Sequence, residues 1–166
     1  QFAARAGVSV FVADYGLAPE RPFPAGLDDA RAVWRGLQAQ GIKRIVIVGD
    51  SAGGGLSLSL LNWASSEAAA GRSQAPVACV VMSPWTDLAL TGSSYATRAD
   101  EEPYLTDGSL KASAALYLGA TEATNPLASP VYGNLAGLPP IQMHVGTAEV
   151  LLDDTLNFAA KVRAAS

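Results

Sequence analysis

The chain has 166 residues, of which 49% are hydrophobic and 16% charged, and its formal net charge is −4. This length suffices for one domain with a hydrophobic core, and the composition excludes a disordered chain. Basic residues are few and scattered, which argues against nucleic acid as a partner. No apolar stretch reaches the roughly 20 residues of a membrane-spanning helix.

The sequence contains one cysteine and one histidine, which excludes an intrachain disulfide and disfavours a zinc site. Cys79 lies in an apolar run and is predicted to be a buried strand residue rather than a catalytic thiol. We expect no metal and no cofactor. Because the given residues show no secretion signal, a cytoplasmic location is expected.

In chain order, apolar residues at 8–15 predict a first strand, and the proline-rich residues 16–24 predict turns. Apolar residues from Leu27 to Leu37 recur at helical spacing and predict an amphipathic helix over 25–40. The later predicted elements are strands at 45–48, 77–82 and 141–145, and helices at 52–70, at 107–118 with Thr106 as N-cap, and from 151 onward. Strands alternating with helices predict the α/β class with a doubly wound, mostly parallel sheet. Residues 86–137 interrupt this alternation as a long, partly helical excursion, and such excursions often shape a site.

The most informative segment is residues 45–53. Four β-branched residues at 45–48 predict a parallel strand covered on both faces, and Gly49-Asp50-Ser51-Ala52-Gly53 follows as a G-x-S-x-G nucleophile elbow. The chain must turn sharply from strand to helix and leave the Ser51 hydroxyl at the apex. Glycine is expected at 49 and 53 because a Cβ at either position would crowd the backbone. The Ala52 N–H is then predicted to face an oxyanion formed by attack of Ser51 on a carbonyl.

With its companion motifs, the elbow resembles the hormone-sensitive-lipase-like branch of the α/β-hydrolases, the bacterial carboxylesterases and acetyl-hydrolases. The matching segments are Asp14-Tyr15-Gly16-Leu17-Ala18-Pro19-Glu20, the elbow, Ser83-Pro84-Trp85-Thr86-Asp87-Leu88, Asn125-Pro126-Leu127-Ala128-Ser129-Pro130 and Gly137-Leu138-Pro139-Pro140. One departure is Gly16, where the branch usually has an arginine that pairs with the glutamate matching Glu20. Cis bonds are hypothesised at Ala18-Pro19 and Phe23-Pro24. The resemblance makes residues 1–166 a partial α/β-hydrolase domain, an internal piece expected to be incomplete at both ends.

The acid of a serine–acid–histidine triad is expected just past the strand at 141–145, where the candidates are Glu149, Asp153 and Asp154. The resemblance favours Glu149, because Glu149-Val150-Leu151-Leu152-Asp153 fits the family pattern acid-x-leucine-x-aspartate. Its loop position agrees, since sites on parallel sheets assemble at the carboxyl ends of strands. Asp153 is the main rival, although Asp153 and Asp154 are predicted to begin the next helix, where the helix dipole stabilises negative charge.

The histidine of the triad is not found. His144 precedes the acid within a strand and is predicted to be structural, held away from the loops at the carboxyl end. The resemblance places the catalytic histidine beyond the 166 residues. The predicted function is a serine carboxylesterase that hydrolyses short- to medium-chain esters through an acyl-enzyme on Ser51, with these 166 residues inactive alone. The alternative is a ligand-binding receptor that keeps the elbow without the base. The expected partner is a small ester, and the oligomeric state is open, with a homodimer as one candidate.

Overall fold

The structure is a computed structural model that describes residues 2–165. Its elements, in chain order, are helices α1 (Phe2–Ala6) and α2 (Ala25–Ala39), strand β1 (Val46–Asp50), helix α3 (Ser51–Ala69), strand β2 (Ala78–Met82), helices α4 (Ser94–Thr97) and α5 (Asp107–Leu118), the 3₁₀ turn η1 (Pro130–Tyr132), strand β3 (Ile141–His144) and helix α6 (Leu152–Ala164). The alternation of strands and helices confirms the α/β class predicted from the sequence. The helix at 107–118 has the predicted bounds, and Thr106 caps it by accepting a hydrogen bond from the Ser109 N–H.

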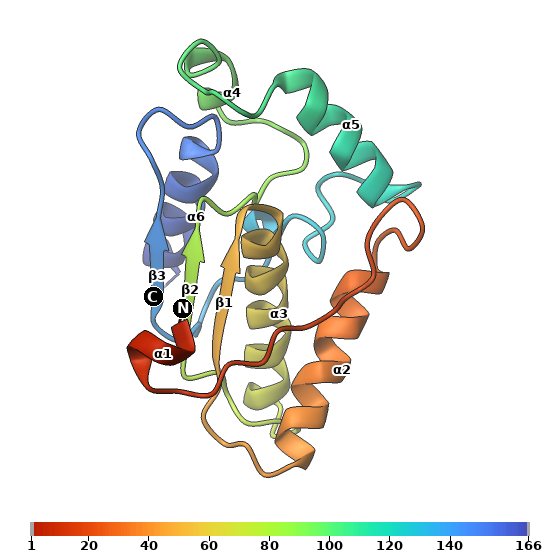
Figure 1. Cartoon of the computed structure of the whole chain (residues 1–166), viewed down its shortest axis with the longest axis vertical. Helices are drawn as coiled ribbons and strands as arrows, with labels where there is room; N and C mark the ends of the chain where they lie inside the picture. The colour runs from red at the N-terminus through yellow and green to blue at the C-terminus, as the bar shows by residue number, and fades with distance from the viewer. Residues whose placement is uncertain (1, 166) are drawn as a thin grey trace.

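The three strands form a parallel sheet in the order β1-β2-β3 (Figure 1). Ile47 lies opposite Cys79, and Cys79 lies opposite Ile141, so these side chains share one face. That face packs in a core with residues of α2, α3 and α6, among them Trp34, Leu58 and Phe158. Cys79 is fully buried there, and burial raises the pKa of its thiol to about 12, which fits a structural residue.

The opposite face of the sheet is not covered by the described residues. Val46 and Val48, predicted to be buried, are 48% and 44% exposed. Crossover connections between parallel strands are nearly always right-handed. When each new strand is added at the same edge of the sheet, all connecting helices therefore lie on the same face. The order β1-β2-β3 runs in one direction only. A helix layer on the second face would require a reversal of strand order, which residues 2–165 do not contain.

The strand predicted at 8–15 is not formed. Residues 8–15 have no regular secondary structure, and Val8, Val10, Phe11 and Val12 are all exposed. β-Branched and aromatic residues favour strands because they pack against a neighbouring strand, and no strand of the described chain lies beside this segment. The hypothesised cis bonds at Ala18-Pro19 and Phe23-Pro24 are both present.

A second core lies beyond the carboxyl ends of the strands, where Figure 1 shows α4 and α5. It joins Leu110, Ala114 and Leu118 of α5 to Trp85 and to Val150 and Leu151, which follow β3. The excursion between β2 and β3 is therefore packed against the loop after β3, in which the acid residue is predicted. Within residues 2–165, no helix is both long and apolar enough to cross a membrane.

Candidate active site

Ser51 is the first residue of α3 and directly follows the last residue of β1. Its φ of +55° lies in the left-handed region, which residues other than glycine rarely adopt. This strain turns the chain from strand to helix within one residue, as the elbow motif predicts. The Ser51 side chain is half-buried, and its hydroxyl has no hydrogen-bond partner among the described residues.

The steric prediction for the two elbow glycines holds at one position and is wrong at the other. A Cβ on Gly49 would collide with the carbonyl of Gly53 and the hydroxyl of Ser57. A Cβ on Gly53 would have as its nearest neighbour the Tyr15 hydroxyl at 3.8 Å, an ordinary contact. Gly49 is therefore required by packing, whereas crowding within the described residues does not explain Gly53.

Two further glycines have roles that the sequence analysis missed. A Cβ on Gly54 would lie 2.9 Å from Cα of Pro84, and a Cβ on Gly55 would collide with the Trp85 carbonyl. Both glycines let the first turn of α3 approach the segment after β2. The signal available in the sequence was the run of three glycines from 53 to 55.

Backbone hydrogen bonds join the carboxyl ends of the three strands. The Trp85 N–H donates to the Ser51 carbonyl at 3.0 Å, and the Ser83 N–H donates to the His144 carbonyl at 2.7 Å. Ser83 also has a positive φ, of 41°. The segment after β2 thus lies between the elbow and the end of β3 and fixes one against the other.

The N-terminus of α3 is available for an anion. The first N–H groups of a helix have no partner within it, and the N-cap residue Asp50 makes no side-chain hydrogen bond to them. Ala52, the second residue of the helix, is exposed. The position of its N–H fits the predicted oxyanion donor.

Glu149 lies in the loop between β3 and α6, as predicted, and is half-buried. Its Oε1 accepts a 2.7 Å hydrogen bond from the Gly146 N–H, and its own N–H donates to the Gly146 carbonyl at 3.3 Å. The carboxylate is thus held against the turn of its own loop. One oxygen, Oε2, makes no hydrogen bond within residues 2–165.

Asp153 is in the first turn of α6, as predicted, and one oxygen of its carboxylate is bonded. Oδ2 accepts hydrogen bonds from the Ser93 hydroxyl at 2.7 Å and from the Ser94 N–H at 2.9 Å. The bond from the Ser93 hydroxyl is the main cause that lowers the pKa of the Asp153 carboxyl. Asp153 therefore acts as an anchor between α6 and the segment before α4.

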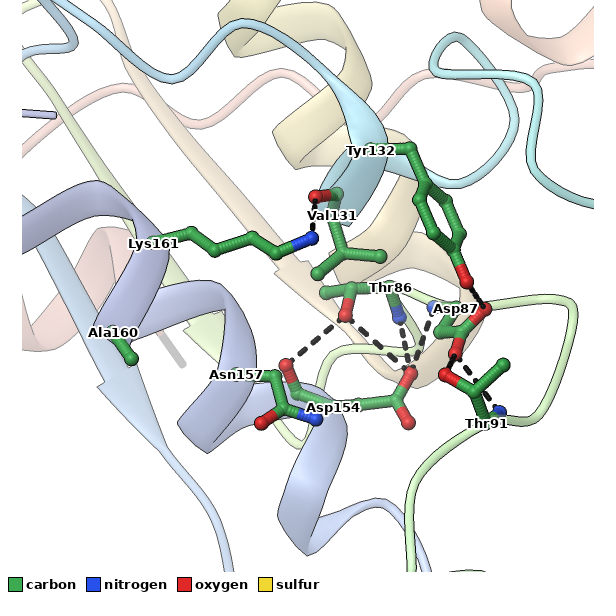
Figure 2. Close-up of a pocket in the computed structure, with 9 residues that line it drawn as sticks. All are labelled: Thr86, Asp87, Thr91, Val131, Tyr132, Asp154, Asn157, Ala160 and Lys161. Atoms are coloured by element: carbon green, nitrogen blue, oxygen red, sulfur yellow. Dashed lines mark hydrogen bonds between the residues drawn. The ribbon is translucent and has the colours of Figure 1, made fainter. Parts of the chain in front are cut away.

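Asp154 is a second anchor and is 2% exposed. Its Oδ2 accepts hydrogen bonds from the N–H groups of Thr86 at 2.7 Å and Asp87 at 2.8 Å (Figure 2). Its Oδ1 accepts one from the Tyr95 hydroxyl at 2.5 Å. Burial, reinforced by the nearby Asp87, raises the pKa of the Asp154 carboxyl to about 6 despite these donors. Together with the bond from the Trp85 N–H to the Ser51 carbonyl, Asp154 links the start of α6 to the elbow.

The alpha/beta hydrolase fold family model matches residues 1–166. The chain belongs to the α/β-hydrolases. It is 44% identical over 151 residues to an acetyl-hydrolase of Streptomyces hygroscopicus, covering 90% of this chain and 49% of that protein. The chain thus spans about half the length of the curated relatives it matches.

Solved structures show which branch of the α/β-hydrolase family the chain resembles. An esterase from the bacterial hormone-sensitive lipase family is 44% identical with a TM-score of 0.85, covering 92% of this chain and 50% of that one. The esterase EstE5, soaked with p-nitrophenyl butyrate, is 44% identical with a TM-score of 0.83, covering 91% of this chain and 50% of that one. These relatives confirm the resemblance to the hormone-sensitive-lipase-like branch.

The cavity drawn in Figure 2 lies apart from the predicted site residues of this hydrolase. Its lining comes from the loop after β2, from η1 and from α6, and includes Asp87, Tyr132, Asp154 and Lys161. Neither Ser51 nor Glu149 lines it. Trp85 is buried in the second core, and Tyr117 packs against it.

His144 is the last residue of β3 and is exposed. It was predicted to lie within the strand, away from the carboxyl-end loops, but β3 ends at His144, one residue earlier than predicted, so this prediction was wrong. His144 still precedes Glu149 in the chain, contrary to the serine–acid–histidine order of this hydrolase family. It makes no side-chain hydrogen bond to Ser51 or Glu149.

The raised pKa of Asp154 predicts how stability depends on pH. Because its folded pKa of about 6 exceeds the ordinary value of 3.8, the stabilisation is complete below 3.8 and is lost as pH rises through 6. This group should lower the free energy of unfolding by about 2.4 kcal/mol between pH 4 and pH 7. Asp154→Asn removes the titration, so the variant should gain stability relative to the parent as pH rises. Urea unfolding of both proteins at pH 4, 5, 6 and 7 measures this, and a pH-independent difference would contradict it.

Proposed function

We propose that the protein containing this chain is a serine carboxylesterase in which Ser51 is the nucleophile. The observation that carries the proposal is the Ser51 geometry. A strained serine at a strand–helix apex, with an unbonded hydroxyl beside uncapped helix N–H groups, suits covalent catalysis. The esterase and acetyl-hydrolase names of the relatives agree with it.

The proposed reaction has two halves. Ser51 Oγ attacks the ester carbonyl carbon while a histidine takes its proton, and the carbonyl oxygen becomes an oxyanion near the Ala52 N–H. The C–O bond to the alcohol then breaks, and the alcohol leaves with that proton. Water attacks the acyl-enzyme through the same histidine and releases the acid and the free Ser51 hydroxyl.

Glu149 is the proposed acid that orients the histidine. It follows β3 at the same edge of the sheet at which Ser51 follows β1, and one of its oxygens carries no hydrogen bond within the described residues. Asp154 has both carboxylate oxygens bonded to donors of residues 86–95, and Asp153 has Oδ2 bonded to Ser93 and Ser94. The choice of Glu149 over Asp153 therefore rests on its loop position and on the family pattern. The base is proposed to be a histidine outside these 166 residues, so the chain alone should be nearly inactive.

The proposed substrates are short- to medium-chain esters. The Streptomyces relative is named an acetyl-hydrolase, and EstE5 was soaked with p-nitrophenyl butyrate. The excursion at 86–137 is proposed to shape the site, because its second core packs on the loop that holds Glu149. We further propose that the enzyme is cytoplasmic and needs no metal or cofactor. The homodimer is the candidate assembly.

Fluorophosphonate labelling of the intact protein, combined with hydrolysis of p-nitrophenyl acetate, tests the function. An esterase should be labelled at Ser51 and turn over the ester, while the 166-residue chain should be slower by about 10⁴-fold or more. A receptor on this scaffold would leave Ser51 unlabelled in the intact protein. Rapid, saturable turnover by the 166 residues alone would place the base within them instead.

A further inference from the structure

Val150 follows the proposed acid Glu149, and both its backbone N–H and its backbone carbonyl are hydrogen-bonded to side chains. The Val150 N–H donates to Glu102 Oε2 at 3.2 Å, and the Val150 carbonyl accepts a 2.6 Å hydrogen bond from the Ser94 hydroxyl. The Val150 side chain is 2% exposed. Both partners come from the excursion between β2 and β3, about 50 residues away in the chain.

Ser94 is itself fixed by Asp153. The Asp153 N–H donates to the Ser94 hydroxyl at 3.0 Å, and the Ser94 N–H donates to Asp153 Oδ2 at 2.9 Å. This reciprocal pair orients the buried hydroxyl toward the Val150 carbonyl. The first turn of α6 and the start of α4 therefore hold one another, and the acid loop ends between them.

We call the two bonds that Val150 makes with Ser94 and Glu102 the clamp. The Glu102 carboxylate bridges Val150 and its own loop. Its Oε1 accepts hydrogen bonds from the N–H groups of Tyr104 at 3.0 Å and Leu105 at 3.2 Å, while Oε2 accepts the one from Val150. Partial burial opposes ionisation of this carboxyl, but the backbone donors outweigh it and lower its pKa. Both oxygens are thus used as acceptors, which an ionised carboxylate can do and an amide cannot.

We propose that Ser94 and Glu102 are positioning residues for catalysis, which act by fixing Val150 and thereby the backbone of Glu149. The inference rests on the proposed function and deepens it, because it assigns residues of the excursion to the acid of the triad. The Gly146 N–H orients the Glu149 carboxylate within its loop, and the bonds from Ser94 and to Glu102 fix the end of that loop to the excursion. Misplacing a catalytic group by 1 Å can lower the rate by about 100-fold.

The test uses Glu102→Gln and Ser94→Ala in the intact protein, with p-nitrophenyl acetate as substrate. The Glu102→Gln variant keeps one acceptor oxygen and so loses one end of the bridge, and the Ser94→Ala variant loses the donor to Val150. Each variant should lower kcat by about 10–100-fold, with KM changed by less than about threefold. The matched controls are Glu101→Gln, whose parent side chain pairs with Arg98 at the surface, and Ser113→Ala on the exposed side of α5. Both controls should keep the parent kcat.

A double-mutant cycle separates positioning from general damage. If Glu102 acts through Glu149, then Glu102→Gln should lower kcat little further in a Glu149→Ala background. An equal loss in both backgrounds, or parent-like kcat in Glu102→Gln, would overturn the proposal. Thermal unfolding identifies variants that do not fold. If the variant at buried Ser94 does not fold, the variant at half-buried Glu102 decides the test. If Glu149→Ala itself kept full activity, the assignment of the acid would fail, a result distinct from failure of the clamp.

Discussion

Replacing Ser51 by alanine in the intact protein is expected to lower kcat for p-nitrophenyl acetate by about 10⁴–10⁶-fold. The substitution removes the only atom that forms the acyl bond and leaves the rest of the elbow in place. KM should change little, because the proposed oxyanion donor is the backbone N–H of Ala52 and not the serine side chain. Steady-state kinetics at high enzyme concentration measure the loss, and fluorophosphonate labelling should disappear with it.

Ser66→Ala is the matched control for this change. Ser66 lies on the same helix, is exposed and makes no side-chain hydrogen bond within the described residues. The control should keep the parent kcat. If Ser51→Ala retained more than about 1% of the parent rate, Ser51 would not be the nucleophile, since triad members normally contribute far more.

The sharp turn at Ser51 and the loop that holds Glu149 could be predicted because both depend on local order along the chain. A short apolar strand followed by Gly-Asp-Ser-Ala-Gly determines where the chain turns, whichever contacts form later. The loop holding Glu149 was found in the same way, from the end of the strand at 141–145 and the start of the helix at 151. Helix α5 was predicted with its N-cap because capping involves only neighbours in the sequence.

Features that depend on distant parts of the chain were not predicted. The need for Gly54 and Gly55 arises from Pro84 and Trp85, which approach α3 only once β1 and β2 are paired. The bonds from Ser94 and Glu102 to Val150 join residues separated by an entire excursion. The wrong strand at 8–15 has the same origin, because an extended apolar pattern becomes a strand only when a neighbour bonds to it.

The proposed acid residue is held more loosely than the residues around it. Asp153 and Asp154 each accept at least two hydrogen bonds from the excursion, and Val150 is held on both sides of its backbone. The Glu149 carboxylate accepts one hydrogen bond, from within its own loop. This contrast matches a division of labour in which the anchors fix the loop and Glu149 keeps an oxygen available for an imidazole N–H.

Glu149→Ala in the intact protein is therefore expected to lower kcat by about 10⁴-fold, as loss of the orienting acid does in serine hydrolases. Asp153→Ala should lower kcat by only about 10–100-fold, because it removes an anchor of Ser94 and leaves the triad complete. The two variants should also differ in stability. Asp153→Ala breaks the bonds to Ser93 and Ser94 and should lower the unfolding midpoint, whereas Glu149→Ala loses a single bond to Gly146.

Measurement of kcat and of the thermal midpoint on both variants decides between the two carboxylates. Glu122→Ala, at an exposed position whose carboxylate makes no hydrogen bond within the described residues, serves as the control and should match the parent in both. If Asp153→Ala abolished turnover while Glu149→Ala left it intact, Asp153 would be the acid. Asp153 Oδ1, which makes no hydrogen bond within the described residues, would then accept the imidazole N–H while Oδ2 stays bonded to Ser93 and Ser94.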